Sequence, residues 1–323
     1  MPTIAPFDLD GPCLAVAFIG DAPHFALADG TVHWLAAGRK QAKLHDGLLC
    51  AAMAPDGGAL ITGGEDGRVM RLAAGVAVEI GSAGRKWVNA VAAGPNGAAA
   101  WAAGRDAVVR TADGVVKSFA HARSVEGLAF APKGLRLAVA RYNGVTLHFP
   151  ATDGKPAELE WTGAHTAVTF SPDGAYVVTA MQENALHGWR LADGRHMKMT
   201  GYPIKVKSLS WSARGRWLAS SGAPAAIVWP FHGKDGPMGK APLELGTRGD
   251  TMVTAVACHP VEEMVAIGYT DGMVMAVRIA DGREALLRRS GNAAVTALAW
   301  DGKGARLAFG TEAGDCGVVD ITG

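Results

Sequence analysis

The chain has 323 residues, and its 31 Lys and Arg residues nearly balance its 30 Asp and Glu residues. This balance gives no overall drive toward nucleic acid or an anionic membrane. A membrane-spanning helix needs a run of about 18 apolar residues, and the sequence contains no such run. The four cysteines contain no CxxC pair and do not indicate a disulfide-rich secreted domain. Because the N-terminal segment lacks the features of a signal peptide, we expect a cytoplasmic protein.

A strand-like pattern recurs about every forty residues from residue 13 onward. Small and large residues alternate in each of its eight copies, and its last position is, in order, Phe18, Met53, Ala93, Phe130, Phe170, Trp211, Cys258 and Trp300. A period of two puts the small residues on one face of a strand and the large residues on the other. Internal repeats at this spacing indicate a propeller or a related array, and the period excludes helical solenoids.

The fifth copy illustrates the strand pattern. A first strand over 165–170 leads into the turn Ser171-Pro-Asp-Gly174, and further strands follow over 175–180 and 182–190. Pro and Gly favour the backbone angles of tight turns, so these clusters predict hairpins. A fourth strand is predicted in seven copies, over residues 43–45, 76–80, 115–119, 157–161, 197–199, 242–245 and 284–287.

The eighth copy lacks a fourth strand, and residues 3–9 have the right length to supply it. Pro6 is tolerated there because an outermost strand leaves one edge unpaired. We therefore predict an all-β fold, an eight-bladed propeller of four-stranded antiparallel blades closed by the N-terminal strand, with seven blades as the alternative. Residues 1–323 would form one domain, with blades beginning near residues 13, 48, 88, 125, 165, 206, 253 and 295.

Several motifs resemble those of the WD-repeat β-propeller family. They are Met53-Ala-Pro-Asp-Gly57, Phe130-Ala-Pro-Lys-Gly134, Phe170-Ser-Pro-Asp-Gly174, Glu65-Asp-Gly-Arg-Val69 and Thr270-Asp-Gly-Met-Val274. The resemblance implies a buried network in each blade that joins a His before the first strand to an Asp in the second turn. His121 and Asp66 occupy such positions and His45 lies near one, whereas Asp does not follow Trp189 or Trp229. The repeats are therefore divergent, and the resemblance is to a bacterial-type member of the family.

No phosphate-binding GxxxxGK[ST] loop, HExxH metal motif or GxSxG nucleophile elbow occurs, so we expect no enzyme, catalytic residue or cofactor. His165, Cys258 and His259 are the best metal candidates, on or beside first strands. Isolated core or surface histidines are the simpler interpretation, so no metal is predicted. A metal-dependent hydrolase or lactonase with a site in the central channel remains the alternative function.

The family resemblance implies a protein–protein interaction scaffold, and the loops suggest where a partner docks. Loops that enter first strands or join second to third strands carry basic and aromatic residues: Arg85, Lys86, Trp87, Arg105, Arg123, Arg141, Tyr142, Tyr202 and Lys205. Other copies carry acidic residues there, including Glu65, Asp271 and Glu312. Because Arg, Tyr and Trp dominate interface hot spots, we expect an acidic peptide or partner protein at the basic loops.

The balanced charge disfavours nucleic acid, and no membrane partner is expected. An assembly subunit with an obligate partner is a further alternative.

Overall fold

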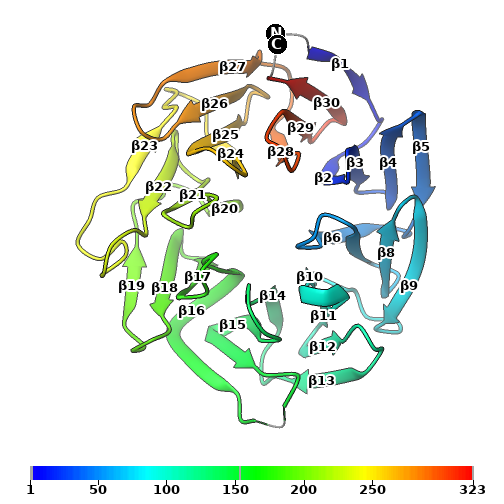
Figure 1. Cartoon of the computed structure of the whole chain (residues 1–323), viewed down its shortest axis with the longest axis vertical. Coiled ribbons are helices and arrows are strands. Elements are labelled where there is room, and N and C mark those ends of the chain that lie inside the picture. The colour runs from blue at the N-terminus through cyan, green and yellow to red at the C-terminus, as the bar shows by residue number, and fades with distance from the viewer. Residues whose placement is uncertain (1–2, 153, 322–323) are drawn as a thin grey trace. The chain divides into compact units, whose positions relative to one another are not determined.

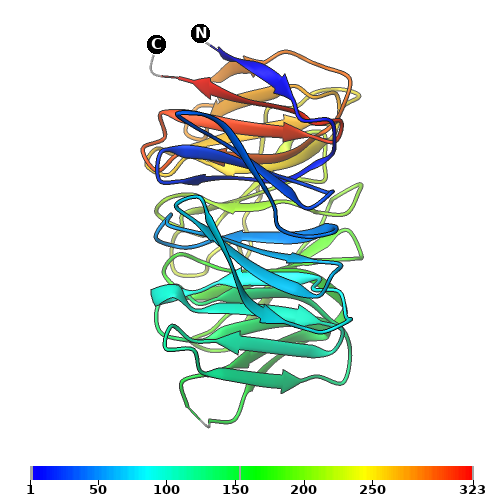
Figure 2. The same ribbon diagram turned by 90° about the vertical axis from the view of Figure 1, so that its right-hand side faces the viewer.

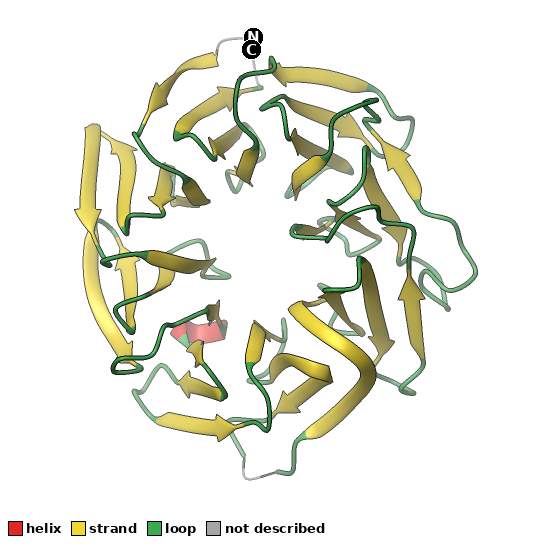
Figure 3. Ribbon diagram, turned by 180° about the vertical axis from the view of Figure 1, so that it is seen from behind, coloured by secondary structure: helices red, strands yellow, loops and turns green. Residues whose placement is uncertain are grey.

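The computed structural model describes residues 3–152 and 154–321, so residues 1–2, 153 and 322–323 of the predicted domain lie outside these ranges. Within them the chain forms antiparallel β-strands and one three-residue 3₁₀ helix, Pro95–Gly97, marked red in Figure 3. No helix in the described ranges has the length and hydrophobicity needed to cross a bilayer. The strands form seven sheets, the blades of a propeller. They fall into two compact units, which are described separately.

The first unit comprises residues 1–27, 33–40 and 201–323. Two of its sheets follow chain order: β20 (Leu209–Trp211), β21 (Trp217–Ser220), β22 (Ala226–Pro230) and β23 (Leu243–Leu245), then β24 (Val253–Cys258), β25 (Met264–Tyr269), β26 (Val274–Arg278) and β27 (Glu284–Arg288). Another contains β28 (Val295–Trp300), β29 (Arg306–Thr311), β30 (Asp315–Asp320) and β1 (Thr3–Asp8). A further sheet, most of which belongs to this unit, consists of β2 (Cys13–Ile19), β3 (Ala22–Leu27), β4 (Thr31–Ala36) and β5 (Gly38–Lys43). Residues 31–32 of β4 and 41–43 of β5 are counted with the second unit.

The second unit comprises residues 28–32 and 41–200. Its four-stranded sheets are β6 (Leu48–Met53), β7 (Leu60–Gly64), β8 (Arg68–Ala73) and β9 (Val76–Ser82), then β10 (Ala90–Ala93), β11 (Ala99–Ala103), β12 (Asp106–Arg110) and β13 (Val116–Ala120). Its six-stranded sheet holds β14 (Val125–Phe130), β15 (Leu137–His148), β16 (Ala157–Phe170), β17 (Tyr176–Met181), β18 (Ala185–Arg190) and β19 (His196–Met199). Figure 1 shows these three sheets following one another in chain order.

The six-stranded sheet overturns the prediction of eight four-stranded blades, and the propeller has seven. The fourth and fifth repeat copies share β16, whose first part pairs with β15 and whose second part pairs with β17. The sequence predicted a break between residues 161 and 165. Instead the backbone continues through Gly163, which adopts a φ of 119° and donates its N–H to Asn143 Oδ1 at 3.2 Å. Because only glycine adopts this φ readily, Gly163 keeps the strand unbroken.

The N-terminal strand joins the last sheet, as the sequence predicted. β1 pairs with β30 through Phe7 opposite Cys316, and the Leu9 N–H donates to Gly314 O at 3.1 Å. Figure 2 shows β1, in blue, beside the red strands of this sheet. The phenyl ring of Phe7 meets that of Phe25 edge-on at 5.2 Å, so β1 also contributes to the core. The fourth strand predicted over 43–45, by contrast, is wrong: β5 spans Gly38–Lys43.

Small residues of one sheet pack against large residues of the next within each unit. In the second unit, Ala90, Ala92, Ala100 and Ala102 share a core cluster with Leu128, Leu137 and Val139. A Cβ at Gly127 would lie 2.9 Å from the Cα of Ala167, which shows how closely β14 and β16 approach. Each large apolar side chain buried this way contributes about 1.5–3 kcal/mol. The alternation read from the sequence therefore drives the stacking of sheets.

Candidate functional site

The basic loops of the second unit are joined to one another by hydrogen bonds. Lys86, in the β9–β10 loop, pairs with Asp106 at the start of β12, with 2.9 Å between Nζ and Oδ2. Arg105 lies in the adjoining β11–β12 turn, and its carbonyl oxygen accepts a hydrogen bond from the backbone N–H of His121 (2.9 Å). His121 belongs to the β13–β14 loop. That loop leads into β14, where Val125 pairs with Arg141 of β15. We call Arg85, Lys86, Trp87, Arg105, Arg123, Arg141 and Tyr142 together the loop surface.

Two of the five cations on the loop surface are neutralised within the protein. Lys86 pairs with Asp106, as above. Arg141 is only 17% exposed, and its guanidinium binds Glu158, the Thr146 hydroxyl (2.9 Å) and the Tyr142 carbonyl (2.9 Å). Sequence reasoning missed Glu158, because it lies on the neighbouring strand β16. Arg141 is therefore a fixed part of the surface and not a free charge.

Three arginines of the loop surface are exposed and unpaired. The side chains of Arg85, Arg105 and Arg123 make no hydrogen bond or ion pair with the part of the chain that the structure describes. They lie on three loops, β9–β10, β11–β12 and β13–β14, which alternate along the chain with the β10–β11 and β12–β13 connections. Trp87 is 61% exposed and Tyr142 is 49% exposed. Unpaired guanidinium groups beside exposed aromatic rings can bind carboxylates and planar groups.

Tyr202 and Lys205, the other two predicted contact residues, belong to the first unit and differ from these. Tyr202 is buried, and its hydroxyl accepts the Trp229 indole N–H at 2.7 Å and bonds the Ser220 hydroxyl at 2.7 Å. Burial raises the pKa of Tyr202 to about 12. The side chain is therefore part of an internal network and offers no surface to a partner. Lys205 is half-buried.

The network that the WD resemblance implies is present in the sheet β6–β9. His45 donates Nδ1–H to Asp66 (3.0 Å), and its Nε2 accepts from the Thr62 hydroxyl (2.8 Å). Partial burial opposes ionisation of Asp66, but hydrogen bonds from His45 and the Arg68 N–H outweigh it and lower the pKa of this carboxyl. His165 and Thr179 form a shorter version in the six-stranded sheet, with 2.7 Å between Nδ1 and Oγ1.

The metal candidates are engaged in internal hydrogen bonds. His165 donates Nε2–H to Trp161 O at 3.0 Å, and His259 donates Nε2–H to Gly304 O at 3.0 Å. The Cys258 thiol lies 3.3 Å from Ser210 O, and burial raises its pKa to about 12, which opposes thiolate formation. No group of three or more His, Cys, Asp or Glu side chains suited to a metal occurs among the described residues.

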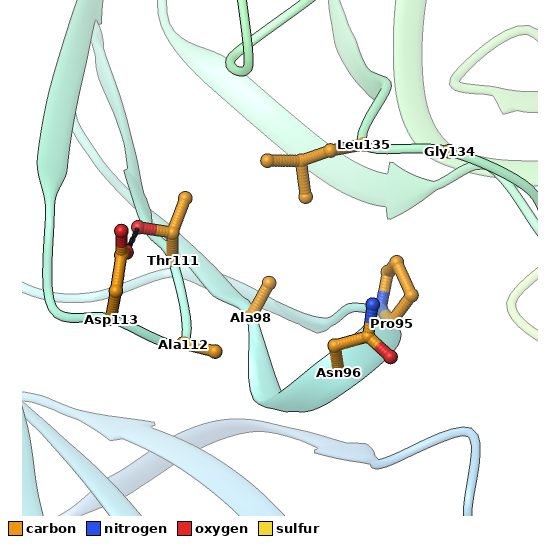
Figure 4. A pocket seen from close by; sticks show the side chains of 8 residues that line it. All are labelled: Pro95, Asn96, Ala98, Thr111, Ala112, Asp113, Gly134 and Leu135. Atoms are coloured by element: carbon orange, nitrogen blue, oxygen red, sulfur yellow. Dashed lines mark hydrogen bonds between the residues drawn. The ribbon is translucent and has the colours of Figure 1, made fainter.

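Two hollows in the described part of the second unit lie near the predicted loops. The smaller, about 350 Å³, is shown in Figure 4, where Gly134 and Leu135 face Pro95, Asn96 and Ala98. Its carboxylate, Asp113, is bonded to Thr111. The larger, about 590 Å³, adjoins the loop surface and is lined by Ala122, Arg123, Arg141, Tyr142, Asn143, Glu160, Trp161 and Thr162. It unites Arg123, Arg141 and Tyr142 with Trp161 and Glu160, which sequence reasoning had assigned only to a strand.

Comparisons with known proteins agree with the fold. No protein-family model matches the chain. Residues of this chain are 25% identical to telomerase protein component 1 of Rattus norvegicus over 189 residues, 56% of the chain, and 25% identical to that of Mus musculus over 191 residues. The chain is a β-propeller that is distantly similar to telomerase protein component 1. It spans 7% of the length of these relatives.

A solved structure supports the fold over nearly the whole chain. The crystal structure of the computationally designed Ika8 protein superposes with a TM-score of 0.77 and covers 97% of this chain and 98% of its own. Its sequence identity is 22%, so the likeness concerns the fold alone. Fold by itself does not assign a function, which has to be argued from the loop surface.

Proposed function

We propose that the protein is a non-catalytic, WD-repeat interaction scaffold whose loop surface binds an acidic segment of a partner protein. The observation that carries this proposal is the set of three arginines with exposed, unpaired side chains, Arg85, Arg105 and Arg123. Trp87 and Tyr142 add exposed aromatic rings to the same loop surface. The distant similarity to telomerase protein component 1 agrees with a WD-repeat module but names no partner.

Physical chemistry favours an acidic partner at this surface. A carboxylate pairs with a guanidinium through two parallel hydrogen bonds, which gives both energy and orientation. Because Lys86 and Arg141 already have carboxylate partners, the three free arginines are the groups that gain most from a ligand. Hydrogen-bonded loops on stacked sheets are already ordered before binding, so little ordering entropy is lost.

Reversing the three free charges tests the proposal. The variant R85E/R105E/R123E should lose binding of a fluorescein-labelled Glu-rich peptide and of the acidic partners that the wild type captures from native cell extract. A matched control, R71E/K133E/K155E, changes net charge equally at exposed positions of the same unit outside the loop surface.

Fluorescence polarisation and quantitative mass spectrometry of captured proteins provide the readouts. Wild type and control should bind alike, with an affinity that weakens as salt rises because exposed charges are screened. Equal binding by the reversed variant would contradict the proposal. Capture of RNA or DNA in place of acidic proteins would identify a nucleic-acid surface instead.

A further inference from the structure

The larger hollow has the features of a specific subsite within the loop surface. It measures about 590 Å³ and lies between the β13–β14 loop, β15 and β16. The loop supplies Arg123, the middle of β15 supplies Tyr142, and the first half of β16 supplies Trp161. Pockets that enclose ligands generally measure about 300–1,000 Å³. The space therefore exceeds what one carboxylate needs and suits a bulky side chain.

The walls of this hollow are held in place by interactions inside the sheet. The Trp161 indole stacks on the buried His187 ring, with centroids 4.1 Å apart and planes 16° apart, and the Trp161 carbonyl accepts from His165 Nε2–H at 3.0 Å. Asn143 Oδ1 accepts the Gly163 N–H at 3.2 Å. Fixed walls lose little entropy when a ligand binds, which favours selective recognition of shape.

The charges of the hollow favour one carboxylate and disfavour a doubly charged phosphate. Arg141 is neutralised by Glu158, and Glu160 is exposed at the lining. Arg123 is thus the one lining cation without a partner among the described residues. A phosphate dianion would face a single free guanidinium and the nearby Glu160 carboxylate, whereas a single carboxylate would be balanced by Arg123.

We propose that this hollow binds an aromatic side chain of the partner segment, whose neighbouring carboxylate pairs with Arg123. The inference rests on the proposed function and adds the residue types that the partner must present. Aromatic rings pack edge-on or offset against Tyr and Trp, and such pairs contribute beyond their buried area. Arg123 at the lining also offers its planar face to a ring.

Three labelled peptides test this inference: Glu-Glu-Trp-Glu-Glu, the same peptide with Ala in place of Trp, and the same peptide with Gln in place of every Glu. The wild-type protein should bind the Trp peptide about tenfold more tightly than the Ala peptide, as a hot-spot contact does. Tyr142→Ala should reduce this preference to less than about threefold, mainly through weaker binding of the Trp peptide. Arg123→Ala should weaken binding of both Glu-containing peptides.

The outcomes separate this inference from the proposed function. Val78→Ala, at another exposed apolar residue of the same unit, is the matched control and should keep the tenfold preference. Equal binding of the Trp and Ala peptides would overturn the aromatic subsite while leaving the acidic docking surface intact. Failure of every Glu-containing peptide to bind would overturn both. Tighter binding of a phosphoserine peptide would also overturn the subsite, because it would show that the hollow prefers a dianion.

Discussion

A single side chain, His187, illustrates how the protein tolerates a buried polar group. It lies in β18 with a fully buried side chain, and neither ring nitrogen has a hydrogen-bond partner among the described residues. Its ring is packed against Trp161 and His196 at centroid distances of 4.1 and 5.2 Å. Burial, with smaller electrostatic contributions from the neighbouring His196, His165 and Lys198, lowers the pKa of His187 from 6.5 to about 3. An unpaired buried group of this kind costs about 1–3 kcal/mol.

We predict that His187→Phe stabilises the protein by roughly 1 kcal/mol at neutral pH, because it removes two unsatisfied nitrogens and keeps the ring packing. The unfolded chain protonates this histidine below pH 6.5, whereas the folded protein resists protonation until about pH 3. The unfolded state therefore binds more protons in this window, and folded-state stability falls as pH falls, by at most about 1.4 kcal/mol per pH unit.

Urea denaturation at several pH values measures this effect. The acid-induced loss of stability between pH 6.5 and 4 should be smaller in His187→Phe than in the wild type. Above neutral pH the two unfolding free energies should differ by a constant amount, which serves as the internal control. A variant with the wild-type acid dependence would contradict the prediction.

At the scale of single elements, the junction between β15 and β16 depends on glycine. Gly144 has a φ of 129°, and a Cβ built on it would lie 2.1 Å from Leu159 O. Gly97 also has a positive φ, 79°, but a Cβ there meets nothing within 4 Å. We predict that Gly144→Ala lowers the unfolding free energy by about 2–4 kcal/mol, from strain and steric clash together. Gly97→Ala should cost only about 1–2 kcal/mol, since it adds the backbone penalty alone.

Chemical denaturation of the two glycine variants provides the comparison. Because Gly144 lies beside Tyr142, Gly144→Ala should also weaken binding of the Trp peptide, and Gly97→Ala should not. If the two substitutions lowered the unfolding free energy equally, the close approach of β15 to β16 would not contribute to stability.

Most strands could be predicted because alternation of small and large residues survives in each repeat copy. β9, β13 and β27 lie within a few residues of their predicted ranges. β5 was misplaced because its exposed residues Arg39 and Lys40 carry no apolar alternation. The merger of two copies through β16 was missed because Gly163 has the sequence signature of a turn.

The candidate site was only partly predictable. Loop membership follows from strand order, so the sequence placed Arg105 and Arg123 on loops, where the structure also has them. Arg141 and Tyr142 were predicted on a loop between two strands, but both lie within the continuous strand β15. Ion pairs such as Arg141 with Glu158 depend on side chains of adjacent strands and leave no local signal. Tyr202 was misjudged for a related reason: it fills the position of the network histidine and turns inward to Ser220.

At the scale of the whole molecule, the last sheet takes its fourth strand, β1, from the first residues of the chain. Without β1, the strand β30 would keep an open edge, and exposed edges are sites of aggregation. Phe7 would also leave the cluster formed by Leu9, Phe18 and Phe25. We predict that deletion of residues 1–9 lowers the unfolding free energy by about 3–5 kcal/mol and the melting temperature by roughly 10 °C.

Adding the missing strand back as a peptide separates loss of pairing from general damage. A synthetic peptide of residues 1–9 should restore the melting temperature of the truncated protein in a concentration-dependent way, because it can pair with β30 and bind only the folded state. The same peptide with Phe7→Ala keeps the backbone donors and acceptors but loses the edge-on contact with Phe25, so it should rescue less. A truncated protein as stable as the full chain, or equal rescue by both peptides, would mean that β1 pairing and Phe7 packing do not stabilise the last sheet.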